Sequence, residues 1–212
     1  MCFSTEASFT AAAGLGIVGI LTLKKCKSKS LYFLASIPLL FAIQQLSEGF
    51  LWLHFNQLID SKIFFKKSIS FFLIFAFLIW PIWIPLSLYL PEKIQWRRIL
   101  IGLNLFCGII LAAVNLYYSL QQDINVQLIN HSIQYLGNTP SQYYIYPVVV
   151  LLPFFLSSLR NAWIFGILTA LAFIVAEYYY METFVSVWCF FAAIVSLSIY
   201  KIVKDNPNIQ SL

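Results

Sequence analysis

Charged residues are scarce in this chain of 212 residues, because Asp, Glu, Lys and Arg make up 10% of it, whereas soluble domains carry about 25%. Hydrophobic residues make up 61%. So little charge excludes an ordinary soluble globular protein, and repeated stretches of about 20 residues without charge are typical of helices that cross a bilayer. The alternating segments of about ten residues that form a membrane β-barrel are also absent. The composition therefore predicts an all-α, polytopic transmembrane helix bundle.

Histidine and cysteine are scarce as well. The two histidines, His54 and His131, form no HxxxH or HExxH motif, and the four cysteines form no CxxC pair. The common zinc and redox motifs are therefore excluded, so we predict no metal site, and the sequence indicates no particular cofactor. A mixed site of His54 with Glu48 and Glu6 stays open as an alternative. No patch of basic and aromatic residues indicates a nucleic-acid partner, and basic loops beside anionic lipids account for the net charge of +5.

What the chain does contain is a series of long apolar segments. Seven are predicted to span the bilayer, at about residues 7–23, 31–55, 68–90, 99–120, 143–159, 162–181 and 183–200. They use up nearly the whole chain, so residues 1–212 are expected to form a single domain. The first segment is short, and the fifth contains Pro147 and Pro153, which favours tilted or broken helices there. The spacing of Ser8, Ala12, Gly16 and Gly19 at three and four residues predicts close packing of the first helix on a neighbour.

The distribution of basic residues predicts the orientation. Lys24, Lys25, Lys27 and Lys29 lie together between the first two spans, and cytoplasmic loops accumulate such residues. With this loop inside, ten of the 13 Lys and Arg residues lie on the cytoplasmic side, and the long loop 121–142 on the other side contains none. The N-terminus is therefore expected outside and the C-terminus in the cytoplasm.

Four carboxylates, Glu6, Glu48, Glu177 and Glu182, lie within or at the edges of the spans, all in the predicted outer half of the bilayer. A charged side chain at bilayer depth costs about 3 kcal/mol on insertion scales, so such residues usually pair, line a cavity or serve function. The second span is the richest. There, Gln44, Gln45, Glu48 and Trp52 recur at three and four residues and form one helix face. This face predicts a ligand, ion or proton site, with hydrogen bonding between helices as the alternative.

The other candidates are polar residues at a similar depth. For Glu6 the alternative role is that of an acidic residue in the first turn of a capped helix. For Glu177 a role in the site and a position at the membrane surface are equally expected, and Glu182 is expected at the surface. The predicted ligand-binding set is Glu48, Gln44, Gln45, Trp52, Glu6, Glu177, Asn115 and Tyr146.

Two motifs carry a resemblance to a known family. The opening MCFSTEASF and the block PLLFAIQQLSEGFLW resemble a family of uncharacterised bacterial multi-span membrane proteins, a domain of unknown function. The resemblance covers the first two spans, and its motif positions are Cys2, Ser4, Ser8, Gln44, Gln45, Glu48, Gly49 and Trp52. It implies a small multi-pass protein of the bacterial cytoplasmic (inner) membrane, and it implies no activity.

Acid, amide and aromatic residues are present, while pairs of a nucleophile with a base are not. We therefore favour a protein that binds or transports a small ligand or cation, with the lipid bilayer as its surroundings. Two alternatives remain: a membrane-embedded enzyme resembling lipid or metal-dependent hydrolases, and a receptor-like or partner-binding module. The sequence does not distinguish transporter from receptor or identify the ligand and the oligomeric state.

Overall fold

The computed structural model describes residues 4–121, 124–136 and 145–207. The helices of its first half are α1 (Thr5–Lys25), the short η1 (Lys29–Leu31), α2 (Tyr32–Ala35), α3 (Ile37–Phe55), α4 (Lys62–Ile74), η2 (Phe75–Ile79), α5 (Trp80–Tyr89) and α6 (Gln95–Gln121). After a hairpin of β1 (Asn125–Ile129) and β2 (Ser132–Leu136) come α7 (Ile145–Leu156), α8 (Ala162–Tyr179), η3 (Met181–Thr183), α9 (Phe184–Val195), η4 (Ser196–Ser198) and α10 (Ile199–Asp205).

The predicted transmembrane bundle is confirmed. Over the described residues, six helical segments are long and apolar enough to cross a membrane: Thr5–Lys25, Lys29–Phe55, Lys62–Tyr89, Gln95–Gln121, Ala162–Tyr179 and Met181–Asp205. The predicted fifth span corresponds to α7, which is apolar but shorter than these six. Its two prolines lie inside the described helix, at Pro147 and Pro153.

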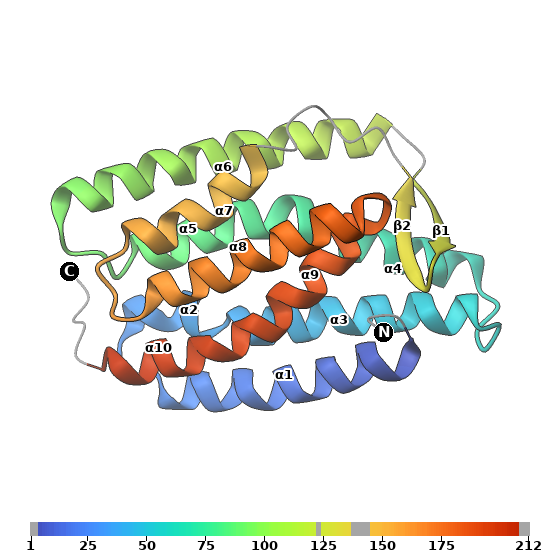
Figure 1. The fold of residues 1–212 in the computed structure, drawn as a ribbon, viewed down its shortest axis with the longest axis horizontal. Helices are drawn as coiled ribbons and strands as arrows, with labels where there is room; N and C mark the ends of the chain where they lie inside the picture. The colour runs from blue at the N-terminus through green and yellow to red at the C-terminus, as the bar shows by residue number, and fades with distance from the viewer. Residues whose placement is uncertain (1–3, 122–123, 137–144, 208–212) are drawn as a thin grey trace.

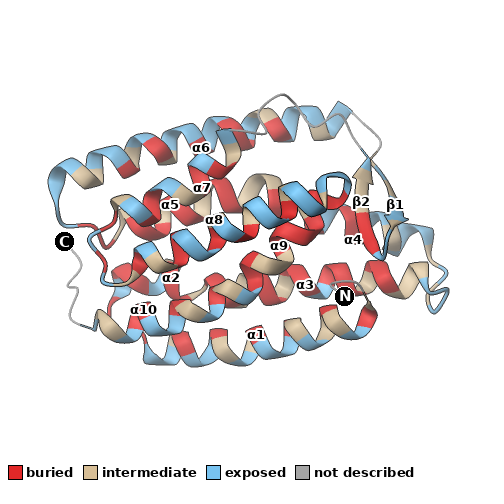
Figure 2. Cartoon of the chain, viewed as in Figure 1, coloured by how far each residue is buried: buried red, intermediate tan, exposed pale blue. Residues whose placement is uncertain are grey.

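The bundle has α6 along one edge and α1 along the opposite edge (Figure 1). Helix α1 begins at the end of the bundle where α3 finishes, which we call the N-terminal end, and α10 finishes at the opposite, C-terminal end. Because the first and last helices have their free ends at opposite ends of the bundle, the arrangement agrees with an odd number of membrane crossings. Buried residues face inward on each helix, whereas α6 and α1 also present exposed faces (Figure 2).

Small residues allow α1 and α3 to pack closely side by side. A Cβ atom added to Gly19 would lie 2.7 Å from the backbone nitrogen of Leu39, and one added to Gly49 would lie 3.0 Å from the ring of Phe9. Ser8 and Ala12 are buried on the same face of α1. The two helices run antiparallel, so Ser8 lies at nearly the same level as Gly49.

Proline interrupts the helical hydrogen bonding of the third span, and side chains of other helices bond to the released carbonyls. The backbone N–H of Trp80 bonds to Phe75, five residues back, which makes η2 one turn of π-helix, and Pro81 has no N–H to donate to Phe77. The carbonyls of Ala76 and Phe77 are met by other helices instead. Tyr146 Oη of α7 donates to Ala76, and Asn115 Nδ2 of α6 donates to Phe77 at 3.3 Å.

Two further prolines release carbonyls that face α6. Pro153 has no N–H for the carbonyl of Val149, and Asn104 Nδ2 of α6 donates to that oxygen at 2.7 Å. Pro85 likewise leaves the carbonyl of Pro81 without its helical donor, and this oxygen points at Gly108 of α6. Pro38 lies in the first turn of α3, just after α2 ends at Ala35, and proline is tolerated there because the first N–H groups of a helix have no partner within it.

The hairpin lies in the predicted outer loop and was not predicted. Asn130 and His131 form its turn with φ of 48° and 58°, the left-handed conformation that two-residue hairpins require. Ser132 and Ile133 are fully buried, and the ring of Tyr135 stacks on Phe72 of α4 at a centroid distance of 4.9 Å. The hairpin therefore packs into the N-terminal end of the bundle, against α4 and α9.

Replacing Gly108 tests this packing. A Cβ at this position would lie 2.0 Å from the carbonyl oxygen of Pro81, so Gly108→Ala forces α5 and α6 apart. We expect the free energy of unfolding to fall by about 1–3 kcal/mol, measured by thermal unfolding in detergent. Gly14→Ala is the matched control, because a Cβ at Gly14 meets no atom within 4 Å. Equal stability of both variants would contradict the close approach.

Candidate functional site

The polar face predicted on the second span points into the bundle. Gln44, Gln45 and Glu48 are completely buried on α3, and Trp52 is nearly so. One carboxylate oxygen of Glu48 accepts a hydrogen bond from Ser186 Oγ of α9, and the other accepts one from Gln45 Nε2 at 3.3 Å. The carboxylate thus joins two spans that are far apart in sequence.

Glu48 has no cationic partner among the described residues. Its hydrogen-bond partners there are the hydroxyl of Ser186 and the amide of Gln45. An ionised carboxylate enclosed among apolar helices without a counter-charge is strongly unfavourable. Within the described residues, the carboxyl group of Glu48 is therefore enclosed without a compensating positive charge.

Buried polar atoms without a described partner occur on this part of α3, on α1 and on the hairpin. They include Oε1 of Gln45 and Nε1 of Trp52 on α3 itself, Oγ of Ser8 on α1, and the hydroxyl of Tyr135 on the hairpin. The pKa of Tyr135 is raised well above its ordinary value, mainly by burial and to a smaller extent by the carboxylate of Glu48. Buried polar atoms normally have partners, so the hydrogen-bonding capacity of this region is incompletely satisfied by the described residues.

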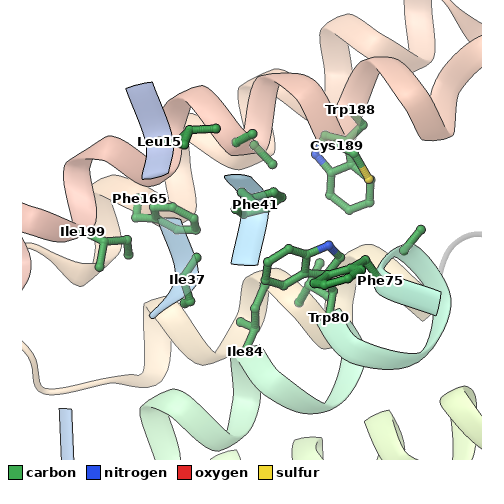
Figure 3. Close-up of a cluster of buried hydrophobic side chains, with 14 of the residues drawn as sticks. Leu15, Ile37, Phe41, Phe75, Trp80, Ile84, Phe165, Trp188, Cys189 and Ile199 are labelled. Carbon is green, nitrogen blue, oxygen red and sulfur yellow. The ribbon is translucent and has the colours of Figure 1, made fainter. Parts of the chain in front are cut away.

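A cavity of about 30 Å³ lies one to two helical turns from Glu48, toward the middle of the bundle. Its wall comprises Phe41, Trp80, Ile84, Tyr146, Val150, Phe165, Thr169, Trp188, Cys189 and Ala192. Figure 3 shows Phe41 of α3, Trp80 of α5, and Trp188 and Cys189 of α9 close together in the core. Trp80 Nε1 donates to Gln44 Oε1 at 2.9 Å and connects this cavity to the face of Glu48. Its size suits a water molecule rather than an organic ligand.

The other two carboxylates of the predicted set lie apart from this cluster. Glu6 is exposed in the first turn of α1, and Ser4 caps that helix by accepting from the backbone N–H of Ala7 at 3.2 Å. Glu177 is half-buried near the end of α8, and Glu182 is exposed in η3. Neither Glu6 nor Glu177 is among the described partners of Glu48.

Asn115 and Tyr146 have identified partners in the protein. Both donate to backbone carbonyls of η2, as described above, and Tyr146 also lines the small cavity. His54 stacks on Phe65 at 4.0 Å, and its Nδ1 lies 3.0 Å from the carbonyl of Ile59. Over the described part of the chain, no three His, Cys, Asp or Glu side chains gather in a group that suits a metal ion.

Sequence reasoning missed three members of the buried cluster. Ser186 and Cys189 lie one turn apart on α9, and Tyr135 reaches the cluster from the hairpin. The hairpin had a detectable signal, because apolar residues alternate on both sides of Asn130 and His131. Ser186 had none, since a single hydroxyl in an apolar helix is common.

A fifth carboxylate, Glu92, was also missed. It is completely buried in the turn between α5 and α6, at the C-terminal end of the bundle. Its two oxygens accept from the backbone N–H of Ile94 at 2.9 Å and from the N–H and hydroxyl of Ser158 at 2.7 and 2.8 Å. Glu92 thus ties the α5–α6 turn to the α7–α8 turn.

Replacement of Glu92 should destabilise the fold. Glu92→Gln turns an acceptor into an amide donor opposite N–H and O–H donors, and we expect a loss of about 1–3 kcal/mol in the free energy of unfolding. Lys93→Ala, at the exposed neighbouring position, is the control. Thermal unfolding in detergent measures both variants, and an unchanged melting temperature for Glu92→Gln would show that the tie is dispensable.

Tyr146→Phe separates packing from a ligand role. Removing the hydroxyl leaves the carbonyl of Ala76 without this donor, and hydrogen bonds between membrane helices contribute about 0.6–1.7 kcal/mol. We expect a stability loss of that size by thermal unfolding. Tyr178→Phe, on the exposed surface of α8, should leave stability unchanged. Wild-type stability of Tyr146→Phe would instead favour a role at the cavity.

Comparison with known proteins agrees with the resemblance of the two motifs and extends it. The chain matches no curated protein and no solved structure. The family of unknown function DUF6629 matches residues 1–211, which includes all seven apolar helices as well as the two motif segments. The chain therefore belongs to the DUF6629 family of unknown function.

Proposed function

We propose that this polytopic membrane protein takes up and releases a proton or a small cation at Glu48, as the binding site of a small transporter. The observation that carries the proposal is the complete burial of Glu48 without a cationic partner among the described residues. The carboxylate therefore needs a proton or cation from outside the described protein groups.

The size of the neighbouring space favours a very small cargo. Pockets for organic ligands enclose about 300–1,000 Å³, whereas the cavity beside Gln44 measures about 30 Å³. Oxygen atoms without a described partner, on Gln45, Ser8 and Tyr135, are suited to a cation or to water that carries a proton. The same cluster offers no supporting observation for a metal-dependent hydrolase.

Hydrogen bonding between helices alone does not require a carboxylate. Gln44 already fulfils that role, because its Oε1 accepts from Trp80 Nε1 of α5 at 2.9 Å. A glutamine at residue 48 would accept from Ser186 through its own Oε1, at lower desolvation cost, and the amide of Gln45 can rotate to present its Oε1 to the new Nε2. The acidic group is therefore better explained by its ability to bind a proton or cation.

The proline-broken helices are suited to act as moving parts. Transporters often use interrupted helices beside their sites. Trp80 lies directly before Pro81 and contacts Gln44, so a movement of α5 changes the surroundings of the Glu48 face. The excess of basic residues in the loops of one side supports an N-terminus outside and a site in the outer half of a bacterial cytoplasmic membrane.

Glu48→Gln tests the proposal. Purified protein in liposomes that enclose a pH-sensitive dye should carry protons when a potassium diffusion potential is imposed, and Glu48→Gln should reduce this flux to that of protein-free liposomes. Sodium uptake measured in parallel covers the cation alternative. The control is Glu182→Gln, because Glu182 is exposed.

Thermal unfolding of the same preparations verifies folding, and Glu48→Gln should stay within about 1 kcal/mol of wild type. Infrared difference spectra between acid and alkaline pH should show a carboxyl band that is absent from Glu48→Gln. Wild-type proton and sodium fluxes in Glu48→Gln would overturn the proposal and leave hydrogen bonding between helices as the role of Glu48.

A further inference from the structure

A second and larger cavity lies on the outside of the bundle. It is a groove of about 640 Å³ between α1 and α9, which continues to η4. Its wall comprises Glu6, Ala7, Thr10, Ala11, Gly14, Leu15, Val18, Phe190, Ile194 and Leu197. The groove shares no lining residue with the small cavity beside Gln44.

The walls of this groove suit a hydrocarbon chain. On α1 the wall combines the small residues Ala7, Ala11 and Gly14 with the apolar Leu15 and Val18. A Cβ added to Gly14 would meet no atom within 4 Å, so the groove is open at its middle. Phe190, Ile194 and Leu197 form the opposite wall. Both walls belong to helical segments long and apolar enough to cross a membrane, so acyl chains are the material that surrounds them.

One end of the groove carries a negative charge. Glu6 lies in the first turn of α1, where the span begins and where lipid headgroups lie. Its side chain is exposed, and among the described residues no Lys or Arg forms an ion pair with it. From Glu6 to Val18 the groove extends about 18 Å along α1, at 1.5 Å per residue, which matches roughly half of a bilayer.

We propose that this groove binds one phospholipid with a primary ammonium headgroup, of the phosphatidylethanolamine class. The ammonium pairs with the carboxylate of Glu6, and one acyl chain lies between the small residues of α1 and the apolar wall of α9. An anionic headgroup such as phosphatidylglycerol has no ammonium for this carboxylate and adds repulsion. The site is independent of Glu48 and of the direction in which the protein is inserted.

The test compares two lipids on purified full-length protein. Protein is extracted from vesicles of equal phosphatidylethanolamine and phosphatidylglycerol content, and native mass spectrometry counts the lipids that each variant retains. Wild type should retain one phosphatidylethanolamine in preference to phosphatidylglycerol. Glu6→Gln should lose the preference, and Glu6→Lys should reverse it.

The acyl part of the site is tested separately. Gly14→Leu places a side chain inside the groove and should abolish retention of the lipid, whereas Ala13→Leu, at an exposed neighbouring position outside the groove, should retain it. Thermal unfolding shows whether each variant is folded. If Gly14→Leu does not fold, the Glu6 variants still test the proposal. Unchanged lipid preference in Glu6→Lys would overturn the proposal, as would a protein dimer without bound lipid.

Discussion

The backbone carbonyls released by prolines determine how the middle of this bundle is assembled. Within a bilayer no water is available to hydrate such an oxygen, so another helix has to approach it. Helix α6 does so with Asn104, Gly108 and Asn115, which lie on one face at intervals of four and seven residues. The two asparagines donate hydrogen bonds from their side-chain amides, and Gly108 allows the carbonyl of Pro81 to approach to a distance that any side chain would prevent. The register of α6 against α5 and α7 follows from these contacts.

This constraint extends to the acidic cluster. Pro81 sets the π-helical turn η2, and the residue before it, Trp80, donates from its indole to Gln44. Gln44 lies one turn from Glu48 on α3, and the close packing of α3 on α1 fixes that face inward. The proline-broken third span and the buried carboxylate are therefore mechanically connected through one hydrogen bond, and neither is an isolated feature of its own helix.

Much of this arrangement was predictable from the sequence, and the reason for the rest is physical. Charge scarcity located the spans, and the spacing of Gln44, Gln45 and Glu48 correctly placed them on one buried face. Polarity also identified Asn115, although its partner at Phe77 depends on a proline 34 residues away. Ser186 was not predictable, because its contact with Glu48 joins residues separated by 138 positions and no local pattern marks it.

Glu48 and Glu92, the fully buried carboxylates of the described residues, are the same residue type in two different settings. Glu92 accepts three hydrogen bonds, two of them from backbone N–H groups, and these hold its carboxyl group in place at the end of the bundle. Glu48 accepts two, both from side chains that can rotate, and lies among polar atoms without a described partner. A carboxylate that only holds helices together is expected to resemble Glu92. Glu48 differs from Glu92 in this respect, and this difference supports the proposal that Glu48 exchanges a proton or a cation.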